Sequence, residues 1–550
     1  MSATDRRATA AVKLDACSSA PACLLVRDAH LLDPRAGLDG PGDLLLREGR
    51  IAEVGAPGAL EAPDGCEELD AAGLHAFPAF FDPHVHLRTP GREDEEDVES
   101  GTRAAAVEFG ARPSPAADLL VRGAHLLDPR AGLDGPGDLL LRDGRIAQVG
   151  APGALEAPNG CEEIDASGLH AFPAFFDPHV HLRTPGREDE EDVESGTRAA
   201  AAGGFGGILA MPNTDPVVDV APVLLSLRER ARTEAHVPVG FLAAITRAQS
   251  GTELTEMAEL ADAGAVAFTD DGLPVRSAGV LRLALQYQRL AGRPLALHEE
   301  DPGLSGPGAM HEGAVSALLG VAGIPSISES TMVARDAAVA GYEGGQVHMQ
   351  HLSARESVEA VEHAKAQGVA VSAEVSPHHL TLTEDDVRAL DTARKMNPPL
   401  RAQADRHALI DGLRSGVIDC VATDHAPHAR EEKEEPFELA PMGTTGLETA
   451  FAALYTELVL PGVLGLELVV ERLTAGGALF GVAVPTLRPE AEANVCLVDL
   501  EARWTVGETG YQSRSDNSCF AGRELAGRVR LTVAGGAVAW REPATASSTA

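Results

Sequence analysis

Eight short apolar runs between residues 172 and 423 constrain the fold of this chain more than any other feature. They span residues 172–177, 206–211, 237–243, 265–269, 294–298, 346–351, 369–375 and 418–423. Helix-like stretches separate many of them, and in residues 353–367 Val358, Val361 and Ala364 repeat at helical spacing. Alternating strands and helices predict an α/β fold, and eight such units predict a (β/α)8 TIM-like barrel. The chemistry of such a barrel lies at the carboxyl ends of its strands.

Metal-ligating side chains stand at the ends of five of these runs: His179 and His181, Asp270 and Asp271, His298, His351, and Asp424. Two imidazoles at positions i and i+2 of an extended segment point the same way and can bind one ion. A lone histidine is more often a structural residue than a ligand. Five run ends that carry such side chains together predict a metal site, because strand ends converge in a barrel.

The lysine content restricts how two metals could be bridged. Some barrel hydrolases use a lysine carboxylated by carbon dioxide, but no lysine occurs between Lys13 and Lys365. The bridging anion must then come from the pair Asp270-Asp271. The predicted ligands are His179, His181, one aspartate of this pair, His298, His351 and Asp424, a set that suits zinc. Zinc lowers the pKa of bound water to about 7, and Asp424 can act as general base and proton carrier.

The two flanks of the barrel region are rich in short strands and turns. Residues 119–149, 494–499 and 528–540 show this pattern, with Gly535-Gly536 as a hairpin turn. We expect both flanks to pair into one small β-sandwich domain. The predicted organisation is a tail at 1–23, a duplicated partial copy at 24–106, a linker at 107–117, sandwich segments at 118–170 and 485–541, the barrel at 171–484 and a tail at 542–550.

Residues 24–106 recur as residues 119–201 with six mismatches; we call these segments copy one and copy two. Copy one comprises half a sandwich and the first barrel strand, and it carries its own pair, His84 and His86. Copy two runs directly into the next apolar run, whereas copy one runs into a Pro/Ser/Ala-rich linker. Because consecutive elements usually pack beside each other, we expect copy two to build the site and copy one to be non-functional.

Composition excludes several classes of function. Acidic residues outnumber basic ones by 83 to 45, and the formal net charge of −38 argues against nucleic-acid binding. The apolar stretches are too short or too interrupted to span a membrane. The seven cysteines include no Cys-x-x-Cys pair, which predicts a reduced, cytoplasmic setting.

Five motifs resemble those of dihydroorotases of the larger bacterial, aspartate-bridged type, which are members of the amidohydrolase superfamily. They begin at His179 (HVHLRTPG), Met211 (MPNTDP), Phe268 (FTDDG), Met396 (MNPP) and Thr423 (TDHAPH). The resemblance covers roughly residues 118–541. It implies a hydrolase of cyclic amide C–N bonds that reversibly closes N-carbamoyl-L-aspartate to L-dihydroorotate and water, the third step of pyrimidine (UMP) synthesis.

The resemblance also implies a role for individual residues. His179, His181, His298 and His351 match zinc ligands, Asp271 the bridging carboxylate, and Asp424 a metal ligand and the catalytic acid/base, with two Zn²⁺ per subunit. The matching substrate contacts are His181, Arg183, Asn213, Asn397, His428, Met442 and Gly443. The planar fork of Arg183 suits a carboxylate, and residues 428–443 resemble a lid. A homo-oligomer and an association with aspartate transcarbamoylase are further expectations.

Two alternative functions remain open. A hydantoinase or allantoinase would share the fold and the metals, although those relatives typically use the carboxylated lysine that is absent here. A non-catalytic dihydroorotase-like subunit of aspartate transcarbamoylase would be expected to have lost metal ligands, whereas this sequence keeps the full set. Metal analysis distinguishes the enzyme from the scaffold, because a scaffold should hold little stoichiometric zinc.

Overall fold

The computed structural model describes residues 23–33, 38–47, 50–63, 66–71, 75–76, 109–111 and 118–543. The chain divides into two compact units, Met1–Glu96 and Asp97–Ala550. His84, His86 and both predicted tails, apart from Cys23 and residues 542–543, lie outside the described residues.

The strands that carry the predicted ligands are parallel and run through the centre of the second unit. One sheet contains β11 (Phe175–Val180), β12 (Phe205–Ala210) and β13 (Val239–Phe241), and another contains β14 (Leu295–Leu297), β17 (Val347–Met349), β18 (Val371–Val375) and β19 (Cys420–Val421). All six residues of β12 are buried. Continuous burial of an apolar strand is typical of a parallel sheet covered on both faces.

Two predicted strands differ from the structure. The run 172–177 is divided, because β10 (His170–Pro173) pairs in a separate flank sheet and β11 begins only at Phe175. The run 265–269 forms no regular strand, although Phe268 makes isolated parallel bridges with both Ala243 and Leu295. Its backbone bonds to both neighbours without forming an unbroken ladder, for example from Val266 N to Phe241 O at 2.9 Å.

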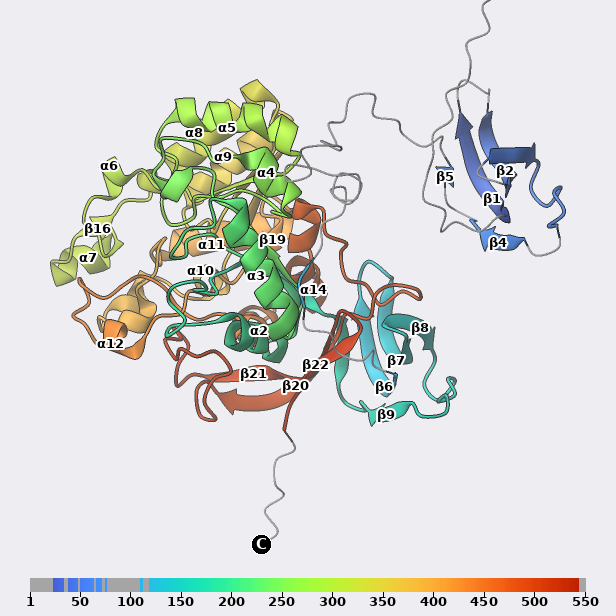
Figure 1. Cartoon of the computed structure of the whole chain (residues 1–550). Helices are drawn as coiled ribbons and strands as arrows, with labels where there is room; N and C mark the ends of the chain where they lie inside the picture. The colour runs from blue at the N-terminus through green and yellow to red at the C-terminus, as the bar shows by residue number, and fades with distance from the viewer. Residues whose placement is uncertain are drawn as a thin grey trace, which may run out of the picture. The chain divides into compact units, whose positions relative to one another are not determined.

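Helices surround these strands, and Figure 1 shows α5, α8 and α9 side by side. The helices are α2 (Val193–Ala202), α3 (Ala221–Glu234), α4 (Met257–Asp262), α5 (Ala278–Ala291), α6 (Pro302–Ser305), α7 (Ala314–Leu319), α8 (Ile327–Glu343), α9 (Arg355–Ala366), α10 (Pro377–Thr381), α11 (Gln403–Ser415), α12 (Arg430–Lys433), α13 (Ala450–Leu454) and α14 (Leu466–Thr474). The helix predicted at 353–367 is confirmed as α9, and Val358, Val361 and Ala364 form its buried face. Two short strands, β15 (Met310–His311) and β16 (Gly323–Ile324), pair with each other.

Strands of both flanks meet in one eight-stranded sheet. Its order is β22-β21-β20-β10-β6-β7-β8, and β9 pairs with β6. The strands are β6 (Leu119–Asp128), β7 (Leu133–Arg142), β8 (Arg145–Gly150), β9 (Glu162–Asp165), β10, β20 (Val495–Thr505), β21 (Glu524–Ala534) and β22 (Ala537–Arg541). Leu139 and Ile146 from copy two pack in one buried cluster with Leu497 and Val533 from the C-terminal flank. This core holds the chain where β10 passes into β11.

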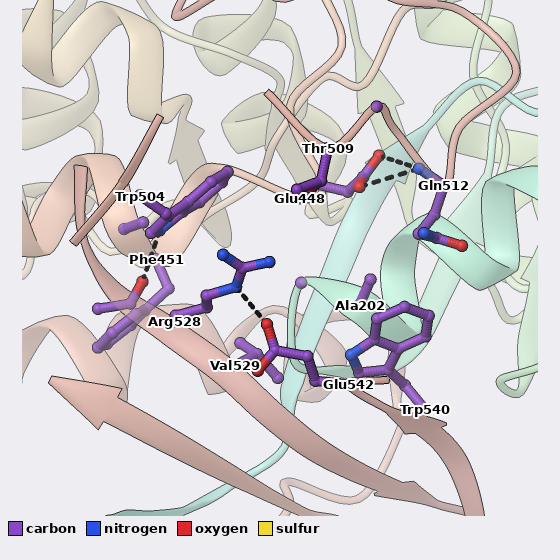
Figure 2. A pocket seen from close by; sticks show the side chains of 14 residues that line it. Ala202, Glu448, Phe451, Trp504, Thr509, Gln512, Arg528, Val529, Trp540 and Glu542 are labelled. Carbon is purple, nitrogen blue, oxygen red and sulfur yellow. Dashed lines mark hydrogen bonds and ion pairs between the residues drawn. The ribbon is translucent and has the colours of Figure 1, made fainter. Parts of the chain in front are cut away.

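A small cavity lies where α2 and α13 meet the flank sheet (Figure 2). Arg528 lies 5.6 Å from the ring centroid of Trp504 and forms an ion pair with Glu542 at 2.5 Å. The Trp504 indole N–H donates to Gly527 O at 3.3 Å. The lining residues include no histidine or cysteine, so this cavity does not offer the predicted kind of metal site. It is a gap in the packing between the flank sheet and the helices.

The first unit repeats the flank hairpin of copy two with the same strand pairing. Its strands are β1 (Cys23–Asp33), β2 (Leu38–Arg47), β3 (Arg50–Gly55), β4 (Glu67–Asp70) and β5 (His75–Ala76). Leu45↔Glu53 in this unit corresponds to Leu140↔Gln148 in copy two. Cys66 is disulfide-bonded, whereas its counterpart Cys161 is a free thiol. The disulfide departs from the reduced cysteines expected from the sequence.

Among the helices that the structure describes, none is both long and apolar enough to cross a membrane.

The two copies offer a matched test of the flank core. Ile146 is fully buried, whereas its counterpart Ile51 is 62% exposed. We expect Ile146→Ala to lower the free energy of unfolding of the second unit by about 2–5 kcal/mol, because it leaves a cavity. Ile51→Ala should change it by less than about 0.5 kcal/mol. Urea unfolding followed by tryptophan fluorescence measures both, since Trp504 and Trp540 lie in the flank sheet. Equal shifts would contradict this account.

Candidate metal centre

The predicted site residues meet in one pocket at the carboxyl ends of the parallel strands. The pocket has a volume of about 230 Å³ and is lined by His181, Arg183, Asn213, Asp271, Gly272, His298, His351, Asn397, Asp424, Ala426, His428, Met442 and Gly443. Every predicted substrate contact is in this lining. His179 is fully buried beneath it.

The Asp271 carboxylate lies at the centre of the pocket. Its Oδ1 is 3.5 Å from His179 Nε2, 3.6 Å from His298 Nδ1 and 3.4 Å from His351 Nε2. Its Oδ2 is 3.4 Å from His181 Nε2. Four imidazoles therefore surround one carboxylate. Burial alone would raise the pKa of Asp271, but the imidazoles, His179 foremost, hold it well below its usual value.

The neighbouring Asp270 has a different environment. Its carboxylate accepts hydrogen bonds from the backbone N–H groups of Ile245 at 2.9 Å and Thr246 at 3.0 Å. Burial raises its pKa to about 6 in spite of these bonds. Of the aspartate pair, only Asp271 reaches the histidines, and Asp270 fixes the loop after β13.

Asp424 follows β19, the last of the parallel strands, and lies beside the same histidines. Its Oδ1 is 3.2 Å from His181 Nε2 and 3.5 Å from His179 Nε2. Burial would raise its pKa, but the neighbouring histidines, His181 first, hold it well below the usual value. Asp424 is therefore a carboxylate, which a general base must be before it takes a proton.

A buried aspartate ties the first and last of these strands together. Asp177 accepts hydrogen bonds from the backbone N–H of His179 at 3.1 Å, and from the N–H and hydroxyl of Thr423 at 3.1 and 2.5 Å. The backbone N–H of His181 also donates to His425 O at 2.9 Å. These bonds fix the histidine pair relative to Asp424.

The donor set fits metal ions. His179, His181 and Asp271 form one group whose ligand atoms all lie within 4.8 Å of one another, and Asp271, His298 and His351 form a second. The buried atoms His179 Nε2 and Asp271 Oδ1 have no hydrogen-bond partner. Unsatisfied buried polar atoms are costly, and nitrogen and carboxylate ligands facing one another suit zinc. Two overlapping sites that share Asp271 follow from this arrangement.

Glu374 on β18 orients one of the histidines, and the sequence analysis missed it. Its Oε1 lies 2.7 Å from His179 Nδ1 and 3.2 Å from the backbone N–H of His351, which donates to it. Its Oε2 lies 3.0 Å from His348 Nε2. The histidines bring the pKa of this buried carboxyl to about 2, against the effect of burial. Glu374 can then only accept, so His179 carries its proton on Nδ1 and offers Nε2 to a metal.

Polar side chains line the substrate side of the pocket, and some of their polar atoms already form hydrogen bonds within the protein. Asn213 Oδ1 lies 2.8 Å from His181 Nδ1, and Asn397 Nδ2 donates to Glu300 Oε2 at 2.7 Å. The Asn213 amide N–H₂ and the Asn397 carbonyl are then the groups that remain for a ligand. His428 Nε2 lies 2.9 Å from Met442 O, which holds the loop 428–443 against the pocket.

Glu190 is a second residue that the sequence analysis missed. It is fully buried, and its Oε2 lies 3.1 Å from Arg183 Nε. Arg183 Nε also donates to Pro427 O at 3.1 Å. Both contacts use Nε, and of the terminal amino groups Nη2 lies 3.4 Å from Nε2 of His428, which lines the same pocket. Glu190 also pairs with Arg187, which in turn pairs with Glu432 on α12. Arg183, Arg187 and Glu190 share the segment between β11 and α2, but their pairing depends on how that segment turns, and Glu432 joins from α12.

The backbone is strained at three site residues. Arg183, His351 and Asp424 have φ of 54°, 33° and 48°. Left-handed backbone costs non-glycine residues about 1–3 kcal/mol and clusters at functional sites, where the surrounding structure holds it. The strain places these side chains toward the common pocket.

An α/β fold whose strand ends bring histidines and aspartates into two metal-binding groups defines the class of amidohydrolases, hydrolases that generally use a divalent metal. The L-hydantoinase (dihydropyrimidinase) of Arthrobacter aurescens has a similar structure, with a TM-score of 0.69 and 26% identity over 77% of this chain and 96% of that one. Residues 170–357 match the protein family described as Dihydro-orotase-like.

Curated relatives are more similar in sequence. A dihydroorotase of Pelotomaculum thermopropionicum is 44% identical over 425 residues, which cover 77% of this chain and 99% of the relative. One from Staphylococcus epidermidis is 43% identical over 74% of this chain and 95% of the relative. The chain belongs to the dihydroorotase family of hydrolases.

The Glu374 contact yields a prediction about metal retention. Glu374→Gln keeps the shape of the side chain but removes the charge that makes His179 a stronger ligand. We expect metal affinity to fall about 10–100-fold, measured as zinc content after dialysis against a chelator. Ser372→Ala is the matched control, because Ser372 lies 2.9 Å from His348 and contacts Glu374 only through it. If both variants lose metal equally, Glu374 has only a structural role.

Proposed function

We propose that this protein is a zinc-dependent dihydroorotase that reversibly closes N-carbamoyl-L-aspartate to L-dihydroorotate and water, the third step of pyrimidine synthesis. The observation that carries the proposal is the pair of metal-ligand groups sharing Asp271 in a pocket that Arg183 also lines. The 44% identity to a dihydroorotase over 99% of its length supports it.

The proposed architecture is a (β/α)8 barrel with a small β-sandwich built from both flanks. The bridges at Phe268 would join the two parallel sheets, and the bridge between Val180 and His425 would close the ring. In this arrangement β11 is the first barrel strand and the segment around Phe268 is the fourth. The similarity to an amidohydrolase structure supports the barrel.

Two zinc ions per subunit are proposed. His179 and His181 would hold one ion, and His298 and His351 the other. Asp271 would be shared by both ions, and Asp424 would be a further ligand of the first ion. When bound, zinc acts as a Lewis acid toward the amide carbonyl and makes water more acidic. The unpartnered His179 Nε2 and Asp271 Oδ1 support this assignment. All of these ligands come from copy two or later, so copy one is not needed for the site.

Asp424 is the proposed proton carrier of the reaction. In hydrolysis it takes a proton from the attacking water and delivers it to the ring nitrogen as the C–N bond breaks. In cyclisation the same carboxylate takes a proton from the carbamoyl nitrogen and the proton leaves with water. The lowered pKa of Asp424 keeps it ionised, and its contact with His181 at 3.2 Å fixes its position in the pocket.

The substrate carboxylate is proposed to bind Arg183. Glu190 and Pro427 engage Nε of the guanidinium, and Nη2 lies 3.4 Å from His428 Nε2, so a bidentate contact with the substrate would use Nη1 and the remaining N–H of Nη2. Asn213 and Asn397 would bind the polar ring edge, together with His428 and the Met442-Gly443 backbone. The loop 428–443 would act as a lid, and its contact between His428 and Met442 O is in place in this structure. A homo-oligomer and a transcarbamoylase partner remain part of the proposal.

Substrate choice tests the proposed function. Zinc-loaded protein should hydrolyse L-dihydroorotate and show at least about 100-fold lower kcat/KM for dihydrouracil, which lacks the carboxylate. Arg183→Lys should raise KM for dihydroorotate about tenfold or more, because lysine cannot form the bidentate contact. Steady-state assays of both substrates measure this. Preference for dihydrouracil or hydantoin would favour a hydantoinase, and stoichiometric zinc without activity would refute the proposal.

The proton carrier gives a separate prediction. Asp424→Asn keeps the size of the side chain but removes its basicity, so kcat should fall about 10²–10⁴-fold. Zinc content measured on the same sample distinguishes lost proton transfer from lost metal. A variant that keeps its zinc and more than about a tenth of its activity would exclude Asp424 as the general base.

A further inference from the structure

One face of the first unit is apolar and lacks the cover that the same face has in copy two. Seven of its apolar positions stay outside a buried core, and we call them the copy-one face: Leu24, Val26, Leu44, Leu46, Ile51, Val54 and Leu69. Beside them Ala29, Leu31 and Ala71 form a small buried cluster, against which Val26 and Leu44 pack. None of the seven is buried, and Ile51, Val54 and Leu69 are 62%, 45% and 47% exposed. The opposite face of the same sheet is buried, with Leu25 at 0% and Leu45 at 5%.

In copy two the matching positions form a core. Their counterparts are Leu119, Val121, Leu139, Leu141, Ile146, Val149 and Ile164, and all seven belong to one hydrophobic cluster. The C-terminal flank completes this cluster with residues such as Leu487, Val495 and Leu531. The backbone is covered as well, because the N–H of Ile146 donates to Ala491 O at 2.9 Å. Nearly identical sequences thus differ in burial because only one of them has this flank.

The number of partners within the chain decides what can cover the copy-one face. Each chain has two half-sheets but one C-terminal flank, and copy two occupies that flank through β10 and β20. Replacing copy two by copy one would only expose the other half-sheet. Every chain therefore has one surplus apolar face, whichever copy uses the flank. Among the described strands, β3 is also an unpaired sheet edge.

We propose that the copy-one face is a self-association surface that docks on the same face of a second copy of this chain. A sheet that is apolar on one face must bury it against another element, and the surplus face of a second chain offers matching apolar positions. A two-fold contact of this kind is self-complementary, so one patch suffices. The proposal is independent of the catalytic function, because it uses no residue of the metal centre.

Sedimentation velocity of the full chain tests the proposal. Over about a hundredfold range of concentration, the weight-average mass should rise to about twice that of Ile51→Glu, because a charge at the most exposed position of the face opposes its burial. Ala52→Glu is the matched control: it adds the same charge at an adjacent exposed position outside the apolar set and should associate like the unmodified chain. Equal masses for the unmodified chain and Ile51→Glu would overturn the proposal.

A charge-complementation experiment guards against a variant that simply unfolds copy one. Ile51→Glu and Ile51→Lys should each fail to associate, and mixing them should restore association to at least about half of the unmodified level, since the two faces then carry opposite charges instead of like ones. Unfolded copies could not restore it. Failure of the mixture to associate, or association that persists in both single variants, would show that this face is not the contact.

Discussion

The Asp271 carboxylate lies among four imidazoles, and the rest of the second unit is arranged to hold that cluster together. Imidazolium rings this close would repel one another without nearby negative charge, and neutral rings would leave unsatisfied lone pairs in a buried space. The cluster is balanced by carboxylates on every side: Glu374 behind His179, Glu300 beside His298, and Asp424 across from His181. The strands serve to bring these opposite charges to one point, and a bound cation fits the same balance.

The sequence allowed a site to be proposed because the candidate residues stand next to strand ends. A run of apolar residues followed by histidine or aspartate is visible without a structure, and the missing lysine left Asp270-Asp271 as the only bridge at those strand ends. The network behind the ligands was not predictable in this way. Glu374 lies inside β18. A carboxylate in an apolar run is visible in the sequence, but the sequence does not reveal that it contacts His179. Glu190 meets Arg183 only because two turns after β11 fold back on themselves.

The observed strands differ from the predicted ones at two places. The first run was expected to be one strand, but β10 and β11 belong to different sheets, and the apolar pattern alone contains no mark of that division. The fourth run makes bridges on both sides without a regular ladder, because backbone bonds there alternate between neighbours. The two copies also show that local sequence does not determine burial. Ile51 and Ile146 have the same local sequence, and only the presence of a distant flank decides which of them is buried.

The bonds between Asp177 and Thr423 join residues 246 positions apart, and they have a consequence for the order in which the protein is made. His179 and His181 leave the ribosome long before Asp424, so no nascent chain shorter than this span can hold the complete ligand set. Contacts of such long sequence separation form late in folding. The complete set of candidate ligands can therefore assemble only after Asp424 and the strand before it have been synthesised.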